Sequence, residues 1–147
     1  MTLVDPIGLI VTEIRDNAVV AAMTEGRVRG FEPAPKTKSY EGDAQGVGKF
    51  KRHVVVVTLG RRREKRLPVQ EVRAAARCYG LDAKDAALVA GAVSDAIHAA
   101  GPRISGTGVG VWNSWDDGGE GALKDPDTAQ PYETVVIQVN AADRPIA

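Results

Sequence analysis

The densest group of potential metal ligands in the chain is acidic. Its carboxylates are Asp116, Asp117, Glu120, Asp125 and Asp127. Carboxylate oxygens bind hard cations, but the spacing of these residues does not match the loop of an EF-hand. Asp125-Pro126-Asp127-Thr128 has the composition of a turn held by side chain to backbone hydrogen bonds. We therefore predict a turn here rather than a metal site.

The second group is basic and reads Arg61-Arg62-Arg63-Glu64-Lys65-Arg66. Lysine and arginine in this density are typical of a phosphate-binding surface. No aromatic side chains alternate with them and no recognition helix is predicted nearby, so sequence-specific reading of a nucleic acid is not indicated. We predict a solvated turn that keeps the end of a strand from aggregating.

The remaining reactive side chains do not form a catalytic pattern. His53 and His98 have neither a partner histidine one helical turn away nor a nearby cysteine, which argues against zinc. Cys78 alternates with charged and polar neighbours as a buried strand residue does. Gly106-Thr-Gly108-Val-Gly110 lacks the spacing of a phosphate-binding loop. We expect no enzymatic activity, no metal and no cofactor.

Local signals predict the elements in the first half of the chain. Asp5-Pro6 has the form of a helix start, and a break near Asp16-Asn17 separates this helix from a short second one ending at Gly26. Alternation predicts a strand over Arg27–Phe31. Residues 34–50 form a long polar, glycine-containing loop that we expect to be flexible. Val54–Val57 is the strongest strand signal, and its unbroken β-branched run predicts that both faces are covered.

The second half of the chain predicts a strand, a helix and two further strands. The first strand is Glu71–Tyr79. A helix follows Asp82, with Asp85 in the position of a capping box, and ends at Gly101-Pro102. We expect a strand over Ile104–Trp115, an acidic hairpin over Asp116–Gln130, and a last strand over Thr134–Val139.

These elements predict one domain over residues 1–147. The expected fold is α+β, with a mostly antiparallel sheet of four to five strands and two main helices packed on one face. The apolar fraction of 44% and the absence of a long apolar run are those of a soluble globular protein without a membrane span. A single cysteine fits a reducing cytoplasm. A neighbouring subunit is one way to cover the second face of Val54–Val57, and the long loop is another.

The formal net charge of zero conceals a separation of the two signs. Between Arg27 and Arg66 there are 12 basic and 4 acidic residues, whereas from Gly80 to the end there are 4 basic and 10 acidic. Two solvated faces of different composition would account for this. A molecule with two complementary edges, suited to head-to-tail contact in a ring, would account for it equally well.

In their order and spacing these pieces resemble the tail terminator (minor tail) proteins of long-tailed phages, particularly those that infect actinobacteria. The resemblance covers nearly the whole chain, and each of its motifs is a structural turn or cap. The segments that carry it are Asp5-Pro6, Arg27-Val28, Val54–Val57, Leu67-Pro68-Val69-Gln70, Arg77-Cys78-Tyr79-Gly80 with the alanine-rich helix after it, and Asp125-Pro126-Asp127-Thr128-Ala129-Gln130-Pro131.

The resemblance implies a structural protein of the virion, at the head-proximal end of the tail, assembled in the host cytoplasm. Such subunits form a hexameric ring that caps the tail tube, ends tube polymerisation and presents a surface to the head-completion protein. Genomic DNA passes through the lumen without sequence-specific binding. The residues expected at the subunit contacts or the lumen are Lys36, Lys38, Arg61, Arg62, Arg63, Lys65, Arg66, Asp116 and Asp117.

Three other functions stay open. The chain could be another head–tail connector or a tail-tube subunit, which would polymerise into long tubes. It could be a small nucleic-acid-binding module that uses residues 61–66, although the acidic C-terminal half would repel a phosphate backbone. An enzyme with an acidic metal site over residues 116–127 has the least support.

Overall fold

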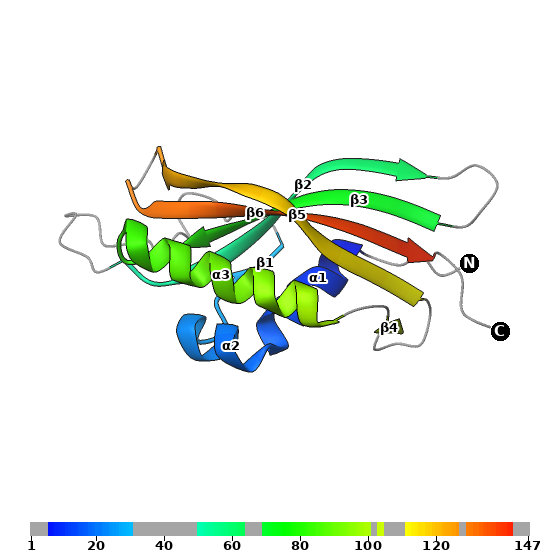
Figure 1. Cartoon of the computed structure of the whole chain (residues 1–147), viewed down its shortest axis with the longest axis horizontal. Helices are drawn as coiled ribbons and strands as arrows, with labels where there is room; N and C mark the ends of the chain where they lie inside the picture. The colour runs from blue at the N-terminus through cyan, green and yellow to red at the C-terminus, as the bar shows by residue number, and fades with distance from the viewer. Residues whose placement is uncertain are drawn as a thin grey trace.

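The structure is a computed structural model, and it describes residues 6–30, 50–63, 69–100, 103–104, 111–126 and 129–142. Its elements in chain order are α1 (Pro6–Asp16), α2 (Ala18–Thr24), β1 (Val28–Arg29), β2 (His53–Arg63), β3 (Val69–Tyr79), α3 (Ala83–Ala100), β4 (Arg103–Ile104), β5 (Val111–Lys124) and β6 (Pro131–Ala142) (Figure 1).

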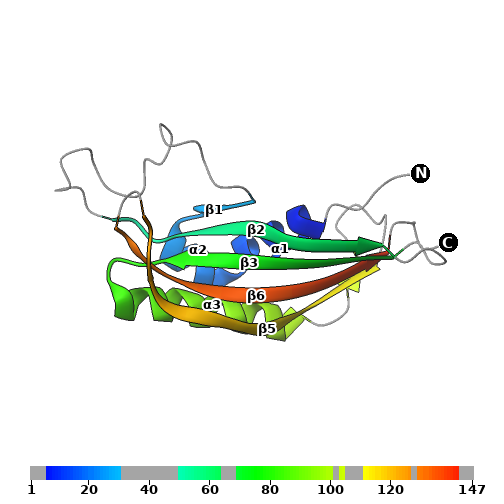
Figure 2. The same ribbon diagram turned by 90° about the horizontal axis from the view of Figure 1, so that it is seen from above.

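The strands form a single sheet in the order β1-β2-β3-β6-β5-β4 (Figure 2). Every neighbouring pair is antiparallel except β1 and β2, which run parallel over two residues. The four long strands, β2, β3, β6 and β5, therefore lie side by side, and the two shortest strands flank them. Strand β3 pairs with β6 without interruption from Val69 opposite Ala142 to Tyr79 opposite Tyr132, which makes these two strands the centre of the sheet.

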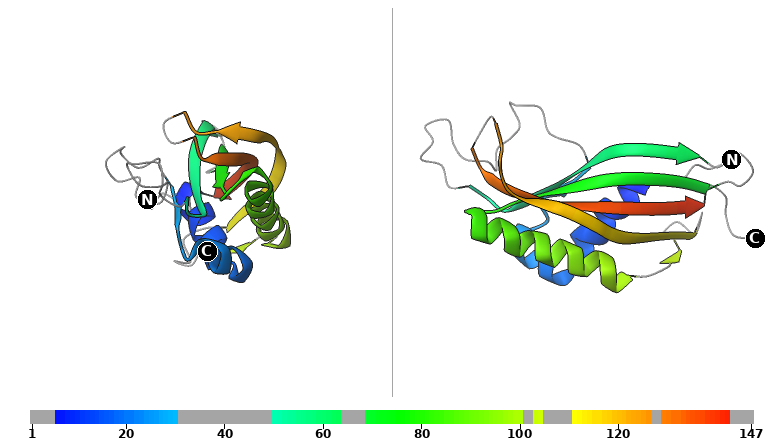
Figure 3. Two further views of the ribbon diagram at one scale, coloured as in Figure 1. Left: turned by 90° about the vertical axis from the view of Figure 1, so that its left-hand side faces the viewer. Right: turned by 45° about the horizontal axis from the view of Figure 1, so that its top comes forward.

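The helices of the described residues, α1, α2 and α3, lie on one face of the sheet (Figure 3). The core between the layers joins Ile10 and Ile14 of α1 to Val89, Val93 and Ile97 of α3, all of them fully buried. The inward-facing strand residues of this core are Val54, Val56, Val72, Ala74, Ala76, Cys78, Val135, Ile137 and Val139. Small alanines on β3 let the helices approach the sheet closely, and burying this apolar surface is the main source of stability.

The fold class predicted from the sequence is confirmed. The chain is α+β, its sheet is mostly antiparallel, and its helices pack against one face. The break between the first two helices is also confirmed, because the side chain of Asn17 accepts hydrogen bonds from the backbone N–H groups of Val19 and Val20 and so caps α2. Glu25, in the left-handed conformation at φ 53°, and Gly26, at φ 80°, follow this helix.

The prediction that both faces of Val54–Val57 are covered is correct for its first three residues. Val55 lies on the face away from the helices and is only 1% exposed in the single chain, and Ala75, which lies opposite Val57 on the same face, is 4% exposed. A neighbouring subunit is therefore not required to bury Val55. Val57 is half-buried.

The prediction of a turn at Arg61 is wrong. β2 continues through Arg63, with Arg61 opposite Val72 and Arg62 opposite Glu71. Backbone pairing with β3 extends the strand although the local sequence is charged, because the ladder of hydrogen bonds forms whatever side chains it carries. The register shifts between Thr58 and Gly60, so that Leu59 is an extra residue on β2.

The prediction of an acidic hairpin over Asp116–Gln130 is also wrong in extent. β5 continues to Lys124, and the connection to β6 is confined to residues 125–130. Register shifts lie between Asp116 and Gly119 and again between Glu120 and Leu123. At each bulge the extra residues of this glycine-rich segment are left unpaired, and pairing with β6 resumes beyond it.

Two predicted strands have different bounds in the structure. The first is limited to Val28–Arg29 and is parallel to β2, since a long connection rather than a tight turn separates them. The segment predicted as one strand over Ile104–Trp115 contains two strands, because Arg103–Ile104 pairs antiparallel with Val111–Trp112.

Several predictions fall on residues outside the described ranges. These are the cap at Asp5, the loop over residues 34–49 with Lys36 and Lys38, the basic residues Lys65 and Arg66, the helix end at Gly101-Pro102, and the glycines at 106–110. Within the described ranges, none of the helices is both long and apolar enough to cross a membrane.

Candidate functional site

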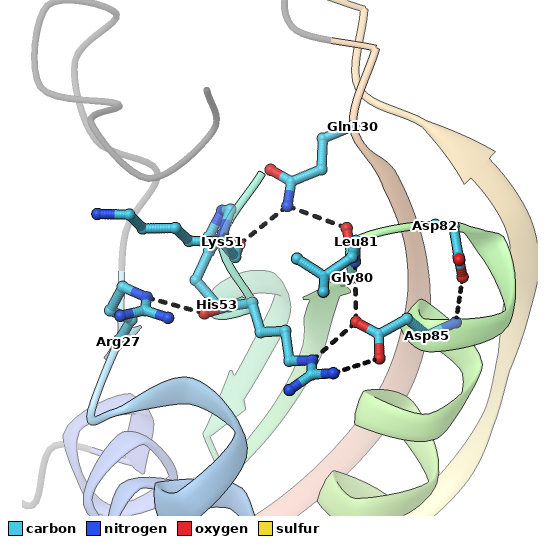
Figure 4. Close-up of polar contacts among 9 residues, drawn as sticks. Arg27, Lys51, His53, Gly80, Leu81, Asp82, Asp85 and Gln130 are labelled. Atoms are coloured by element: carbon cyan, nitrogen blue, oxygen red, sulfur yellow. Dashed lines mark hydrogen bonds and ion pairs between the residues drawn. The ribbon is translucent and has the colours of Figure 1, made fainter. Parts of the chain in front are cut away.

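One end of the sheet holds a cluster of polar side chains, at the point where β2 and β6 begin and β3 leads into α3 (Figure 4). We refer to it as the polar cluster, and its members are Arg52, His53, Tyr79, Asp85, Asp125 and Gln130. It joins segments that are far apart in the sequence.

Arg52 and Asp85 form a two-pronged ion pair in this cluster. Arg52 donates through Nε to Oδ2 of Asp85 at 2.8 Å and through a terminal nitrogen to Oδ1 at 2.9 Å. Asp85 Oδ2 also accepts the backbone N–H of Leu81 at 2.8 Å. These donors lower the pKa of Asp85, the hydrogen bond from Arg52 being the largest cause.

The same carboxylate belongs to the start of α3. Asp82 Oδ1 accepts the backbone N–H of Asp85 at 2.8 Å, which confirms Asp82 as the N-cap. Asp85 does not complete the capping box in the expected way, because it accepts from Leu81 instead of returning to the N–H of Asp82. The ion pair to Arg52 thus ties the start of β2 to the first turn of α3.

His53 and Tyr79 form the apolar side of the cluster. Their rings stack with centroids 4.2 Å apart and an interplanar angle of 6°. His53 Nδ1 donates to the carbonyl of Lys51 at 2.9 Å, and the Tyr79 hydroxyl donates to Asp125 Oδ2 at 3.0 Å. Burial lowers the pKa of His53 to about 4, because the imidazolium would lose its hydration there.

Gln130 connects three segments of backbone. Its Nε2 donates to the carbonyl of Lys51 at 2.9 Å and to the carbonyl of Gly80 at 3.1 Å. The N–H of Gly80 in turn donates to the carbonyl of Pro131 at 3.1 Å. Figure 4 shows Gln130 lying between the β2 start and the β3–α3 connection.

Gly80 makes this connection possible. A Cβ atom built at Gly80 would lie 2.6 Å from the backbone Cα of Ala86. No side chain fits at that distance, so only glycine lets the chain turn from β3 into α3 while the first turn of the helix rests against it.

Burial decides what the polar cluster can do. His53, Gln130 and Tyr79 are at most 1% exposed, and Asp125 is 3% exposed. A substrate cannot reach these groups in the folded chain, and their hydrogen bonds go to backbone carbonyls and to Asp125. We therefore assign the polar cluster a structural role, in which it fastens β2, the β3–α3 connection and the β5–β6 turn together.

The residues that the sequence marked as contacts lie elsewhere. Arg61, Arg62 and Arg63 are at the C-terminal end of β2, and Asp116 and Asp117 are on β5. β3 and β6 separate these two strands, so the structure does not bring the basic and acidic residues together within one chain. It places them on strands on opposite sides of the central β3–β6 pair.

Sequence reasoning missed the polar cluster as a unit. Asp85 was identified from its position after Asp82, but its partner Arg52 is 33 residues away in the sequence. Gln130 carries no mark in the sequence either, because only the structure shows that it is buried and so needs polar contacts. Within the described part of the chain, no group of histidine, cysteine and acidic side chains is placed to hold a metal ion.

The prediction that Cys78 is a buried strand residue is confirmed. It is fully buried on the helix-facing side of β3, and burial raises the pKa of its thiol far above the ordinary value. It therefore packs as a small apolar residue and is not a reactive nucleophile in the folded chain.

No protein-family model matches the chain, and a search of curated proteins finds no match.

Proposed function

We propose that this chain is a structural subunit of a phage tail that forms a homo-oligomeric ring, a hexamer, at the head-proximal end of the tail tube. The ring ends tube polymerisation and presents the surface to which the head-completion protein binds. Genomic DNA passes through its lumen without sequence-specific binding. The chain acts by shape and contact and has no catalytic role.

One line of support comes from the sequence and two come from the structure. The order of turns and caps resembles that of tail terminator proteins over nearly the whole chain. The α+β architecture of the structure is compatible with such a subunit, and the buried polar cluster fits a role in holding a rigid building block together rather than one in chemistry.

The observation that carries the proposal is the position of the charges in the sheet. The arginines at 61–63 lie on β2, toward one edge, and the acidic residues at 116, 117 and 120 lie on β5, toward the other edge. A subunit with two complementary sides associates head to tail, and head-to-tail contacts close into a ring when the rotation per subunit divides a full turn.

The experiment is a measurement of solution mass by light scattering over a range of protein concentrations, with and without magnesium, combined with negative-stain electron microscopy. A discrete ring of one size supports a terminator. Long tubes of one diameter would identify a tail-tube subunit instead.

A monomer that binds DNA would favour the nucleic-acid-binding module. In that case the affinity for a DNA duplex falls steeply as the salt concentration rises. The slope of log affinity against log salt concentration is about −1 for each phosphate that the protein neutralises. The ring proposal expects weak binding of free DNA, because the acidic residues after Gly80 outnumber the basic ones by 10 to 4.

A further inference from the structure

Within the described ranges, each of the two outer long strands has a backbone edge that no other strand pairs with along most of its length. β1 pairs with β2 only at Val54 and Val55, and no other strand in the described ranges borders Val56–Arg63 on that side. β4 pairs with β5 only at Val111 and Trp112, which leaves Asn113–Lys124 without a described neighbour on its outer side. Unpaired N–H and C=O groups of an edge strand are a template for pairing with another chain.

The two open edges carry opposite charges. The β2 edge ends in Arg61-Arg62-Arg63, whereas the β5 edge contains Asp116, Asp117 and Glu120. Opposite charges on adjacent strands stabilise their pairing, and like charges destabilise it. Pairing of two β2 edges would bring no acidic residue to the arginines, and pairing of two β5 edges in full overlap would bring carboxylates close to one another. The charges therefore favour pairing of a β2 edge with a β5 edge over either symmetric dimer.

The strand directions allow this pairing. β2, β3, β6 and β5 alternate in direction because each adjacent pair is antiparallel, so β2 and β5 run in opposite directions. A second copy that continues the sheet would place its β2 antiparallel to this β5. The new pair would repeat the hydrogen-bond pattern of the rest of the sheet.

The register of the sheet shows how far one copy must shift along the strands of the next for the opposite charges to lie level. Arg61 lies opposite Val72, Val72 opposite Val139, and Val139 opposite Ser114, so Arg61 is level with Ser114 across the sheet. Bringing Arg61 of one copy opposite Asp116 of the next needs a shift of two residues, about 7 Å. A constant shift of this kind accompanies the strand tilt of any sheet that closes on itself.

We infer that the ring closes by strand addition: the Val56–Arg63 edge of one copy pairs with the Asn113–Lys124 edge of the next, with Arg61 opposite Asp116. In this register Arg62 and Asp117 are each one residue from that pair along their own strands. The partner is a second copy of this chain. The inference rests on the proposed function, which requires a ring, and adds to it the two surfaces that form each contact.

The test uses two full-length variants. The basic-edge variant carries Arg61→Glu with Arg62→Glu, and the acidic-edge variant carries Asp116→Arg with Asp117→Arg. Each variant alone sets like charges against each other at every contact, so we expect the concentration for half-assembly to rise by at least about tenfold.

An equimolar mixture of the two variants should restore assembly. In the mixture, glutamates of the basic-edge variant face arginines of the acidic-edge variant, and the next contact joins the two unchanged edges. Both contacts are attractive only when the variants alternate around the ring. Native mass spectrometry should therefore find equal numbers of the two variants, and an unfolded variant could not give this result.

Control variants reverse the same number of charges on exposed side chains away from both edges. Lys51→Glu with Lys84→Glu matches the basic-edge variant, and Asp16→Arg with Asp95→Arg matches the acidic-edge variant. Both controls should assemble as the wild type does. Circular dichroism and thermal melting confirm that all four proteins are folded.

The outcomes separate the inference from the proposed function. Rings formed by each edge variant alone, or folded variants whose mixture stays monomeric while the wild type forms rings, would overturn the edge pairing and leave the ring standing. Wild-type tubes that both variants abolish and the mixture restores would keep the edge pairing and overturn the terminator function. A wild type that stays monomeric overturns both.

Discussion

At the residue scale, burial of His53 makes the stability of the fold depend on pH. Burial, with smaller contributions from the nearby charges of Arg29 and Arg27, lowers the pKa of His53 from 6.5 to about 4. Between these values the unfolded chain binds a proton that the folded chain does not. The contribution is therefore complete above about pH 6.5 and is lost as the pH falls toward 4.

We predict that the free energy of unfolding falls by about 3 kcal/mol between pH 7 and pH 4 through this residue, at about 1.4 kcal/mol per unit of pKa difference. Urea denaturation at a series of pH values measures it. His53→Asn should be less stable than the wild type at pH 7 but should lack this part of the pH dependence. An unchanged slope in His53→Asn would contradict the assignment.

The ion pair of Arg52 and Asp85 gives a second prediction at this scale. The side chain of Asp85 is 11% exposed and that of Arg52 is 36% exposed. Water therefore reaches the guanidinium group of the pair more readily than the carboxylate. Asp85→Ala removes the acceptor for Arg52 and for the Leu81 N–H. We expect a loss of about 1–3 kcal/mol in urea denaturation.

The matched control for Asp85 is Asp95→Ala on the same helix, where the side chain is exposed. Its effect should stay within about 0.5 kcal/mol. Equal effects of the two substitutions would show that the ion pair does not fasten α3 to the start of β2.

At the element scale, the connection from β3 to α3 depends on a glycine. Gly80→Ala would press a methyl group against the backbone of Ala86, which lies in the first turn of α3. We predict a loss of about 1–3 kcal/mol in the free energy of unfolding, as expected for overpacking against backbone.

Gly91→Ala is the matched control, because it introduces the same methyl group where a Cβ atom would have no atom within 4 Å. Gly91 lies inside α3, so alanine should stabilise the helix by about 0.5–1 kcal/mol. The two substitutions should therefore shift the denaturation midpoint in opposite directions. A shift in the same direction would contradict the close approach at Gly80.

The sequence predicted the elements whose signals are local. The Asp16-Asn17 helix break, the apolar stripe of α3 and the Glu71–Tyr79 core of β3 were all readable from spacing and composition. The C-terminal half of β2 and the second half of β5 were not. Charged or glycine-rich residues carry no strand signal there, and pairing with β3 and β6 overrides local preference.

The polar cluster was beyond sequence reasoning for a related reason. Its contacts join residues that are distant in the chain, such as Tyr79 and Asp125, which are 46 positions apart. A single sequence shows which side chains are polar but not which of them the sheet brings together. The separation of charge was visible in the sequence, whereas its placement on opposite sides of the central β3–β6 pair required the strand order.

At the scale of the whole molecule, contacts made by opposite charges on the β2 and β5 edges should weaken with salt. The screening length falls from about 10 Å at 0.1 M salt to about 3 Å at 1 M. We predict that the concentration for half-assembly rises between these two salt concentrations, as measured by light scattering. Assembly that strengthens with salt would indicate an apolar interface instead.

The most direct test of the central claim is the mass of the wild-type particle in solution. Light scattering over increasing protein concentration should show the 15.5 kDa chain converting to a single species of six times that mass, with no larger product. A chain that stays monomeric at every concentration, or one that grows into polymers of unlimited length, would contradict the account of a ring-forming tail terminator.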